Sequence, residues 1–546
     1  MNTLHSYRLI IFCACAVLYI ISLTNTVLVN DDYMALYTSW LLSISMEENV
    51  DFNVDSYTLL FSLLKPIYYL LGNEFEVIYA FRFIFSIVIT IISYQSYILM
   101  RFFIPKSSAI SALFLLLTSL ALVVRGLDIR PDLIITSLWL QIIIVIYVYS
   151  FNGIYKMIII GFTISLAILF KFKAIVICPI IVYYWVFRLV VNKSIKKSFS
   201  EIIAFIFGFL GCFLLFIAVE GGGGFKLFID TTIDLILYST SNSSTANLLK
   251  FEVLKSYMVL DIMFWLPAIA GIGSSIIMIK SQELSFNQAQ CLVSILILAL
   301  LSIVTNPHYH AYNLVTLYSL LTPFVAFTIH KISKVNGIMS SFIVFISCLF
   351  LLYRGFYYTF KNNNQHQIAL HQFINKNTEE NDAVFAFEGI GLYRPSTYHW
   401  RTSAIKLSNY YEGNYSVWYE INKTAPILVI ESYRIPKWLT KKDRSQLYNH
   451  YIELAPFVLV MGFETESIKQ AEVLREGWYL ITNSELNACL VNEENIVSGD
   501  KVWLKSGLNT MVAKKGHCKL HWFFSSEAIS LLKESNLNHR PYLYAP

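Results

Sequence analysis

The stretch TNTVLVNDDY, residues 24–33, decides how this chain is organised. It ends an apolar run that starts near residue 9 and is long enough to cross a lipid bilayer. No small-residue cleavage site precedes the acidic pair, so we interpret the run as a first membrane span and not as a signal peptide. Asp31 and Asp32 follow the span directly. This position puts two carboxylates at the water interface, where they stay ionised and still reach between helices.

The composition predicts a polytopic α-helical membrane protein. Of 546 residues, 56% are hydrophobic and 14% are charged, and the mean hydropathy is +0.57, whereas a soluble domain carries about 25% charged residues. The net charge of +5 is spread over many loops and does not indicate nucleic-acid binding. We expect eleven spans, at about residues 9–29, 77–100, 107–124, 133–150, 156–170, 173–191, 201–219, 258–279, 288–304, 311–329 and 338–357.

The loops alternate in charge. The loops on the side of the N-terminus contain Arg101, Lys106, Lys156, Arg188, Lys193, Lys196, Lys197, Lys280, Lys331 and Lys334. The first loop on the other side instead carries Glu47, Glu48, Asp51, Asp55, Glu74 and Glu76 against Lys65. Because cytoplasmic loops are enriched in Lys and Arg, we expect a cytoplasmic N-terminus. The acidic pair and the C-terminal part are then on the outer side.

Two outer loops have structure of their own in this prediction. In the first loop, residues 33–44 have helical periodicity with Asp31 or Asp32 as N-cap, and residues 57–71 form an apolar helix on the membrane surface, interrupted at Lys65. A later outer loop opens at Glu220 and the following four glycines and runs to about residue 257. Its Ser/Thr/Asn-rich centre predicts a mobile segment.

Beyond residue 357 the composition becomes polar. We expect a transmembrane domain at residues 1–357 and a soluble domain at residues 358–546, with a mixed α/β unit followed by a small antiparallel sheet. The pattern predicts strands at residues 383–387, 427–431 and 457–461 and a helix at residues 444–454. No dinucleotide-binding, P-loop or nucleophile-elbow motif occurs there. Cys489 and Cys518 are the two cysteines outside apolar blocks, and we predict that they form a disulfide.

Charged residues also gather on the outer side of later spans. The segment RGLDIRPD, residues 125–132, contains Arg125, Arg130 and Asp132, and the next outer turn contains Lys171 and Lys173. Each has an ordinary structural explanation. Asp132 can pair with Arg130 or cap the fourth span, and the cations can reach lipid headgroups. Arg82 lies inside the second span, where a charge needs a partner, such as an acidic residue of the first loop.

Taken in order, these features resemble the C-type (GT-C) superfamily of membrane glycosyltransferases. The shared features are the acidic pair after the first span, YYLLG at residues 68–72, YAFR at residues 79–82, RPD at residues 130–132, and a soluble domain after the last span. Within the superfamily the chain is similar to the bacterial serotype-converting O-antigen glucosyltransferases. It departs from the common pattern at His-Pro-Pro in the first loop, where Leu64-Lys65-Pro66 stands nearby, so the position of the acceptor is expected to differ.

The resemblance implies an enzyme of the bacterial inner membrane, with its C-terminal domain in the periplasm. It would move a sugar from a polyprenyl-phosphate donor to a hydroxyl of a glycan or lipid-linked acceptor. One aspartate of Asp31, Asp32 and Asp132 would act as general base. The donor phosphate would be held by Arg82, Arg125, Arg130, Lys171 and Lys173. The acceptor would contact Tyr57, Lys65, His308 and His310.

Other hypotheses remain open from the residues alone. A transporter or flippase of a lipid-linked saccharide would carry broken or charged segments at mid-membrane in two halves, whereas here the charges gather at one face. A structural or assembly protein would not need outer cations. A divalent metal is possible, for example at His308 and His310, although such residues are more often interfacial. The C-terminal domain is rich in aromatic residues, and two hypotheses account for them. They stack on a saccharide acceptor, or they form the domain's core or its contact surface with the membrane. These residues are Tyr393, Tyr398, Trp400, Tyr410, Tyr411, Trp418 and Tyr419.

Overall fold

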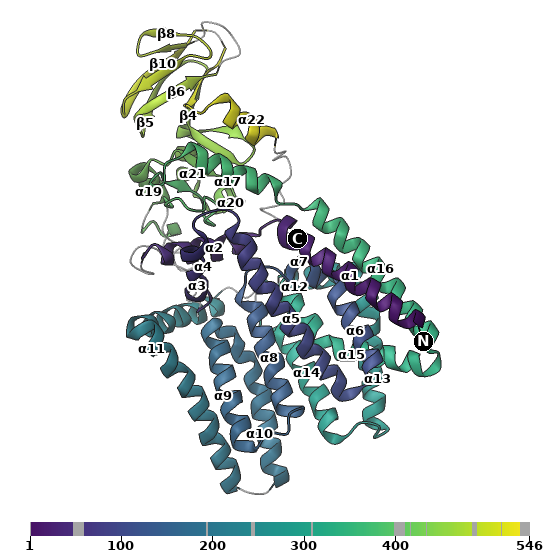
Figure 1. The fold of residues 1–546 in the computed structure, drawn as a ribbon. Helices are drawn as coiled ribbons and strands as arrows, with labels where there is room; N and C mark the ends of the chain where they lie inside the picture. The colour runs from purple at the N-terminus through teal and green to yellow at the C-terminus, as the bar shows by residue number, and fades with distance from the viewer. Residues whose placement is uncertain are drawn as a thin grey trace.

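The computed structural model is a bundle of long helices with a mixed α/β domain stacked on one end (Figure 1). It describes residues 2–46, 59–192, 195–241, 246–306, 310–397, 410–414, 416–432, 434–482, 489–514 and 516–534. The first part contains α1 (Asn2–Asn25), α2 (Asn30–Ser43), α3 (Leu59–Leu64), α4 (Pro66–Leu71), α5 (Val77–Phe103), α6 (Lys106–Thr118), α7 (Leu120–Arg125), α8 (Pro131–Tyr147), α9 (Gly153–Phe170), the 3-10 helix η1 (Phe172–Ile177), α10 (Cys178–Asn192), α11 (Ile195–Ser241), α12 (Ala246–Leu260), α13 (Ile262–Lys280), α14 (Phe286–Val304), α15 (Asn313–Val335) and α16 (Gly337–Lys361).

The chain is a multi-pass integral membrane protein. In the described part, nine helical segments are long and apolar enough to cross a bilayer, compared with the eleven spans that we expected. The other two expected spans correspond to shorter helices, α6 with 13 residues and α8 with 17 residues. The expected third span is interrupted at Ser119, whose backbone is extended. The interruption is stable because the Asp261 carboxylate accepts the N–H groups of Leu120 and Ala121, at 2.9 and 3.3 Å.

The irregular conformation expected for the outer loop after Glu220 is wrong. Helix α11 continues for 47 residues through the four glycines and ends at Ser241. Glycine lowers helix stability in water by about 1 kcal/mol per residue relative to alanine. Helix α12 then follows where the rest of the loop was expected.

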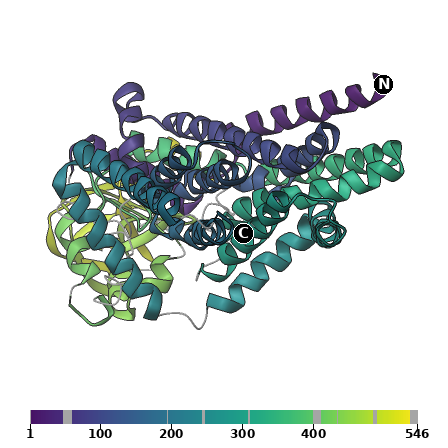
Figure 2. The same cartoon turned by 90° about the horizontal axis from the view of Figure 1, so that it is seen from below.

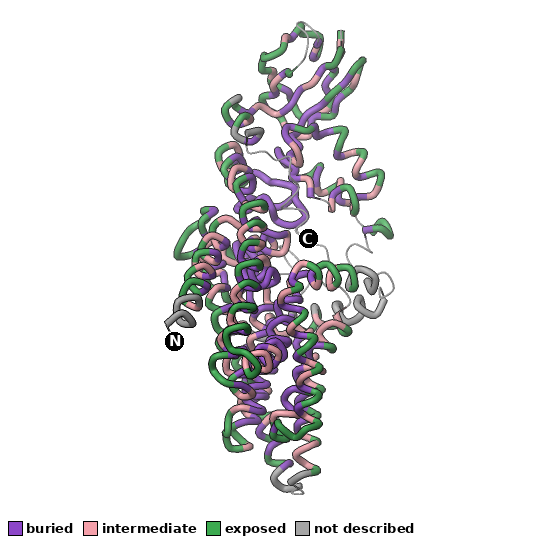
Figure 3. The backbone as a smooth tube through the Cα atoms, turned by 90° about the vertical axis from the view of Figure 1, so that its right-hand side faces the viewer, coloured by how far each residue is buried: buried purple, intermediate pink, exposed green. Residues whose placement is uncertain are grey.

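Close helix packing builds the core of the bundle. A Cβ atom added to Gly161 would meet the Phe205 backbone, one added to Gly208 would meet the Ile158 backbone, and one added to Gly271 would meet the Phe324 carbonyl. Small residues at these crossings let the helix backbones approach, as is typical of membrane bundles. Buried residues run along the centre of the bundle and exposed ones cover its outside (Figure 3).

Helices α1 and α16 lie side by side and bring the acidic pair to the C-terminal domain (Figures 1 and 2). The Ser22 and Thr359 hydroxyls are 3.2 Å apart, and an isolated β-bridge joins Thr26 to Asn363. The N-terminal end of α1 points away from the C-terminal domain (Figure 1). The acidic pair and the C-terminal domain are therefore at the same end of the bundle.

The C-terminal domain contains two sheets. The seven-stranded sheet has the order β1-β2-β4-β11-β6-β9 with β3 beside β4, and the four-stranded sheet has the order β5-β10-β7-β8. The bounds are α17 (Gln365–Asn377), β1 (Val384–Phe385), α19 (Val417–Thr424), β2 (Leu428–Ile430), α20 (Arg434–Trp438), α21 (Lys441–His450), β3 (Tyr451–Ala455), β4 (Val458–Thr465), β5 (Ile468–Val473), β6 (Gly477–Ile481), β7 (Cys489–Val491), β8 (Glu494–Ile496), β9 (Lys501–Leu504), β10 (Gly507–Ala513), β11 (Cys518–Trp522) and α22 (Ser526–Glu534).

The sequence predicted part of this arrangement. Strands β1, β2 and β4 lie within or overlap the expected segments. The helix expected at residues 444–454 is wrong in its last four residues, because α21 ends at His450 and β3 begins at Tyr451. The helix ends there because the following residues pair with β4 as a strand. Tyr451 lies opposite Met461, and Ile452 lies opposite Val460.

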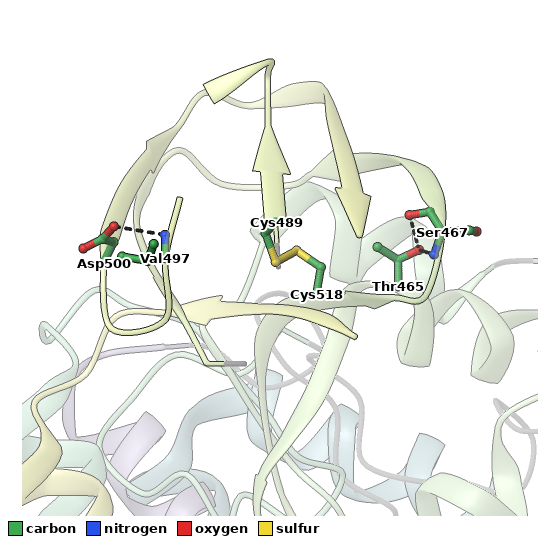
Figure 4. Close-up of a disulfide and its surroundings, with 6 residues drawn as sticks. All are labelled: Thr465, Ser467, Cys489, Val497, Asp500 and Cys518. Carbon is green, nitrogen blue, oxygen red and sulfur yellow. Dashed lines mark hydrogen bonds between the residues drawn. A yellow bond between two sulfur atoms is a disulfide. The ribbon is translucent and has the colours of Figure 1, made fainter. Parts of the chain in front are cut away.

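The predicted disulfide between Cys489 and Cys518 is confirmed (Figure 4). Cys489 begins β7 of the four-stranded sheet, and Cys518 begins β11 of the seven-stranded sheet. The Cα atoms are 5.5 Å apart. The bond therefore ties the two sheets to each other.

The aromatic residues that we considered for sugar stacking have different surroundings. Tyr393 is buried, its ring lies against Trp40 and Tyr68, and its hydroxyl donates to the Glu74 carbonyl at 3.0 Å. It forms part of the domain's seat on the first-loop helices. Tyr410 belongs to the domain's own core and donates to Asp443 at 2.7 Å. Trp418 is half-buried, Tyr411 and Tyr419 are exposed, and Tyr398 and Trp400 lie outside the described residues.

Candidate functional site

The two aspartates of the acidic pair have different surroundings. Neither is the N-cap that we expected: Val29 holds that position, and both aspartates lie in the first turn of α2. Asp32 is fully buried, and its oxygens accept the backbone N–H groups of Val29 at 3.1 Å and Ile129 at 2.7 Å. The side chain of Asp31 is 31% exposed and forms an ion pair with Arg130. Asp32 therefore holds two loops together, while Asp31 faces the outside of the cluster.

Arg82 lies behind the acidic pair. It is almost fully buried, and its terminal nitrogens donate to the carbonyls of Leu23 at 3.2 Å and Val27 at 3.1 Å. These carbonyls lie at the C-terminal end of α1, where the helix dipole favours a positive charge. Arg82 also attracts the charge of Asp32. Its geometry fits the structural explanation, in which an acidic residue of the first loop is its partner.

A chain of ion pairs runs through the loop between α7 and α8. The guanidinium of Arg125 is 3.7 Å from the Asp128 carboxylate, and Asp128 is 3.9 Å from Arg130, which pairs in turn with Asp31. Asp128 received no role in the sequence prediction, although its position three residues after Arg125 is a pairing signal. The loop thus gathers two arginines and two carboxylates at the end of the bundle that faces the C-terminal domain.

Tyr312 connects this series of ion pairs to the turn before α15. The guanidinium of Arg130 lies 3.6 Å from the centre of the Tyr312 ring, and Lys173 Nζ lies 5.8 Å from it. His310 stacks on Tyr312 at 5.4 Å between ring centres. Cation–π contact of this kind holds an arginine without using its N–H groups. His310 therefore adjoins the cluster, and Tyr312 is a contributor that the sequence prediction missed.

Asp132 forms a second charged group beside the first. It lies in the first turn of α8, after Pro131, and pairs with Lys173 and, at 3.5 Å, with Lys171. Lys173 also donates to the Asn313 side chain at 3.1 Å. Asp132, Lys173 and Asn313 line a cavity of about 70 Å³ with Thr316 and Trp139. The two lysines are partly exposed, so they are accessible to an anion from solvent.

Burial and neighbouring charges act against each other in this cluster. Burial raises the pKa of Asp32 and of Asp128, and the charges of Arg82 and Arg125 respectively oppose that rise. Burial alone would lower the pKa of Arg130, but the charge of Asp31, aided by Tyr312, leaves the pKa of Arg130 above its ordinary value. Arg130 is therefore a permanent cation at the centre of the cluster.

A larger cavity of about 290 Å³ lies on the Arg125 side, between the ends of α1, α7, α12 and α16. Its wall is mostly apolar, with Val27, Leu120, Val124 and Leu260 among its residues. Arg125 is buried in this wall. The cavity therefore offers apolar surface beside one arginine, and its lining also contains one carboxylate, that of Glu252.

The remaining candidates are less central. Lys65 lies between α3 and α4 and is partly exposed. Tyr57 and His308 lie outside the described residues. Among the residues that the structure describes, no group of three or more His, Cys, Asp or Glu side chains is arranged to hold a metal ion.

The fold has solved relatives. No protein-family model and no curated protein sequence matches this chain. Among solved structures, it is similar to ArnT from Cupriavidus metallidurans bound to undecaprenyl phosphate, with 10% identity, 84% of this chain and 98% of that chain covered, and a TM-score of 0.56. It is also similar to the oligosaccharyltransferase of Archaeoglobus fulgidus, in its apo form (12% identity, coverage of 91% and 74%, TM-score 0.51) and in complex with zinc and sulfate (12%, 80% and 71%, TM-score 0.50). The chain is therefore a polytopic membrane protein with a GT-C-like fold.

Proposed function

We propose that this chain is an integral-membrane glycosyltransferase. It moves a sugar from a polyprenyl-phosphate donor to a hydroxyl of a glycan or lipid-linked acceptor, such as an O-antigen. The observation that carries the proposal is the apolar cavity with Arg125 buried in its wall, joined by ion pairs through Asp128 and Arg130 to the partly exposed Asp31. A polyprenyl phosphate has this combination of properties, an apolar chain with an anionic end.

The donor occupies the larger cavity in this proposal. The isoprenoid chain contacts the apolar wall, and the phosphate lies at Arg125 and Arg130. Arginine suits this role because its planar guanidinium contacts two phosphate oxygens at once. The ArnT structure, which was solved with undecaprenyl phosphate bound, supports a ligand of this class for the fold. Lys171 and Lys173 supply further positive charge as the leaving phosphate becomes more negative.

Asp31 is the proposed general base. Its carboxylate takes the proton of the acceptor hydroxyl while the hydroxyl oxygen bonds to the anomeric carbon. The bond from that carbon to the phosphate oxygen breaks, and the polyprenyl phosphate leaves with both electrons of that bond. A single displacement inverts the anomeric centre. Asp32 is less suited to this role, because both of its oxygens already accept backbone N–H groups.

The acceptor reaches Asp31 under the C-terminal domain, which we propose guides the saccharide. Two tryptophans of this domain, Trp478 and Trp503, lie opposite each other on β6 and β9 and are about half exposed. Their rings are 5.4 Å apart at 79° and form a corner. Aromatic faces stack on the apolar faces of sugars. His310 and Lys65 remain candidates for contacts nearer the membrane.

The compartments follow from the charge distribution. Successive loops alternate between the two sides of the membrane. The basic loops fall on the side away from the acidic pair, which supports a cytoplasmic N-terminus. Transfer then takes place on the periplasmic side of a bacterial inner membrane, together with the C-terminal domain.

The experiment is reconstitution of the purified protein in liposomes with a panel of undecaprenyl-phosphate hexoses and a lipid-linked oligosaccharide acceptor. Mass spectrometry measures the glycosylated acceptor, and a fluorescent lipid-linked saccharide reports movement across the bilayer. Transfer that is lost in Asp31→Asn supports the proposal. Movement of the lipid-linked saccharide across the bilayer without transfer would instead favour a flippase.

A further inference from the structure

Helix α7 is too short to be stable by itself. It has six residues, Leu120–Arg125, and begins directly after the extended Ser119. An isolated helix of this length does not form in water, because its first N–H groups and last carbonyls lack partners within the helix. Its last residue is Arg125, the arginine of the larger cavity. The position of Arg125 therefore depends on what holds α7.

Asp261 supplies the missing partners at the start of α7. It lies between α12 and α13 and is fully buried. One carboxylate oxygen accepts the Leu120 N–H at 2.9 Å, and the other accepts the Ala121 N–H at 3.3 Å. This is the chemistry of an N-cap, supplied by a residue about 140 positions away in the chain. A negative charge at a helix N-terminus also stabilises the helix, because it interacts favourably with the positive end of the helix dipole.

The other end of α7 is held by the same segment. Tyr257, one turn before Asp261, is buried, and it lines the larger cavity together with Arg125. The Asp261 backbone N–H in turn donates to the Tyr257 carbonyl at 2.8 Å. The end of α12 therefore contacts both the first and the last residues of α7, and both elements line the larger cavity.

Asp261 is itself fixed from α15. The Tyr318 side chain lies beside its carboxylate, and Trp265 Nε1 donates to the Tyr318 oxygen at 2.8 Å. The Tyr318 ring stacks on Phe264 at 4.4 Å. These contacts leave the carboxylate one orientation, toward the start of α7. A side chain that only packed in the core would not need the hydrogen-bonding contacts that Asp261 has.

We propose that Asp261 is a positioning residue, which caps α7 and thereby holds Arg125 in the wall of the larger cavity for the phosphate of the donor. The role as a cap is independent of the proposed function, whereas the consequence for the donor rests on it. Asp261 does not touch the donor. Its effect reaches the phosphate only through α7 and Arg125.

Hydrogen–deuterium exchange of the full chain in detergent tests the cap without any ligand. Asp261→Ala is expected to raise the exchange of the segment around residues 119–125 and to leave α13 and α15 protected. Asp261→Asn is expected to keep most of the protection, because an asparagine oxygen still accepts one N–H group. Glu201→Ala is the matched control, since Glu201 is another buried carboxylate but pairs with Arg188 of α10 at 3.0 Å. Unchanged exchange around residues 119–125 in Asp261→Ala would overturn the cap.

Binding of undecaprenyl phosphate, without sugar, tests the consequence. Asp261→Ala is expected to weaken binding about tenfold, and Asp261→Asn much less. Because Asp261 acts through Arg125, the double variant Arg125→Ala/Asp261→Ala should bind no more weakly than Arg125→Ala alone. Additive losses in the double variant would overturn the positioning role. If Arg125→Ala itself binds normally, the donor site proposed above fails, while the exchange result still decides whether Asp261 caps α7.

Discussion

The Asp32 carboxylate accepts the backbone N–H of Ile129 at 2.7 Å, across 97 positions of the chain. This bond fastens the start of α2 to the loop that carries Asp128 and Arg130. The neighbouring Asp31 pairs with Arg130, and its side chain is 31% exposed. The two adjacent aspartates therefore have different surroundings: Asp32 is bound by backbone N–H groups of two elements, and Asp31 lies on the partly exposed side of the cluster.

Replacing each aspartate by asparagine should separate these roles. Asp31→Asn is expected to lower transfer by more than about a hundredfold without changing thermal stability, because an amide cannot take the proton. Asp32→Asn is expected to lower the free energy of unfolding by about 1–3 kcal/mol, because its NH₂ group must face a backbone N–H donor. Initial rates and thermal unfolding measure the two effects. Full activity of Asp31→Asn would remove it as the base.

Arg130 should determine the use of the donor. Arg130→Ala is expected to raise the KM for the polyprenyl-phosphate sugar by about ten- to a hundredfold, the value of a lost charged hydrogen bond. Arg130→Lys should recover only part of this loss, because an ammonium cannot make the two-point contact or stack flat on Tyr312. Lys280→Ala, at the exposed end of α13, is the control. A change confined to the acceptor KM would contradict the assignment.

Gly271 should be sensitive to the smallest substitution. Gly271→Ala would push a Cβ atom into the Phe324 carbonyl and force α13 and α15 apart, at a cost of about 1–3 kcal/mol. Gly273 lies two residues later in the same helix, and a Cβ atom there meets nothing within 4 Å. Gly273→Ala should therefore leave stability unchanged or raise it slightly. Thermal unfolding in detergent distinguishes the two, and equal melting temperatures would show that the helices relax without cost.

Loss of the disulfide should destabilise the C-terminal domain. The two cysteines are 29 residues apart, and closing a loop of this size contributes about 3–4 kcal/mol. Cys489→Ser/Cys518→Ser is expected to lower the unfolding temperature of this domain, and reductant should then have no further effect. Cys13→Ser, which removes an exposed thiol of α1, serves as the control. Alkylation of both cysteines in the unreduced, denatured wild type would refute the bond in solution.

The exposed tryptophan pair should matter for the acceptor alone. Trp478→Ala/Trp503→Ala is expected to raise the KM for an oligosaccharide acceptor by about tenfold, because stacking of this kind contributes about 1 kcal/mol per ring. Donor KM and binding of undecaprenyl phosphate should not change. Leu508→Ala removes an even more exposed apolar side chain from the other sheet and should have no effect. An unaltered acceptor KM in the tryptophan variant would place the acceptor elsewhere.

Local patterns predicted most of the architecture. The apolar run at residues 77–100 became α5 because hydropathy is a property of neighbouring residues. The break at Ser119 was not predictable in this way, since it depends on Asp261, far along the chain. The glycines after Glu220 suggested a loop, but α11 continues through them to Ser241. For the site, Arg125, Arg130, Lys171 and Lys173 were identified from their side of the membrane, whereas the contact of Arg130 with Tyr312 required the packing of α8 against α15.

The topology of the C-terminal domain has a consequence for its biogenesis. Strand β11 is the last described strand in the chain, yet it lies inside the seven-stranded sheet, between β4 and β6. Until the ribosome has passed Trp522, β4 and β6 cannot join into one sheet, and Cys489 has no Cys518 to meet. During this interval the open strand edges are templates for pairing with other chains. The open edges of the soluble domain therefore persist until its last described strand has been made, after the helices through α16 have already been synthesised.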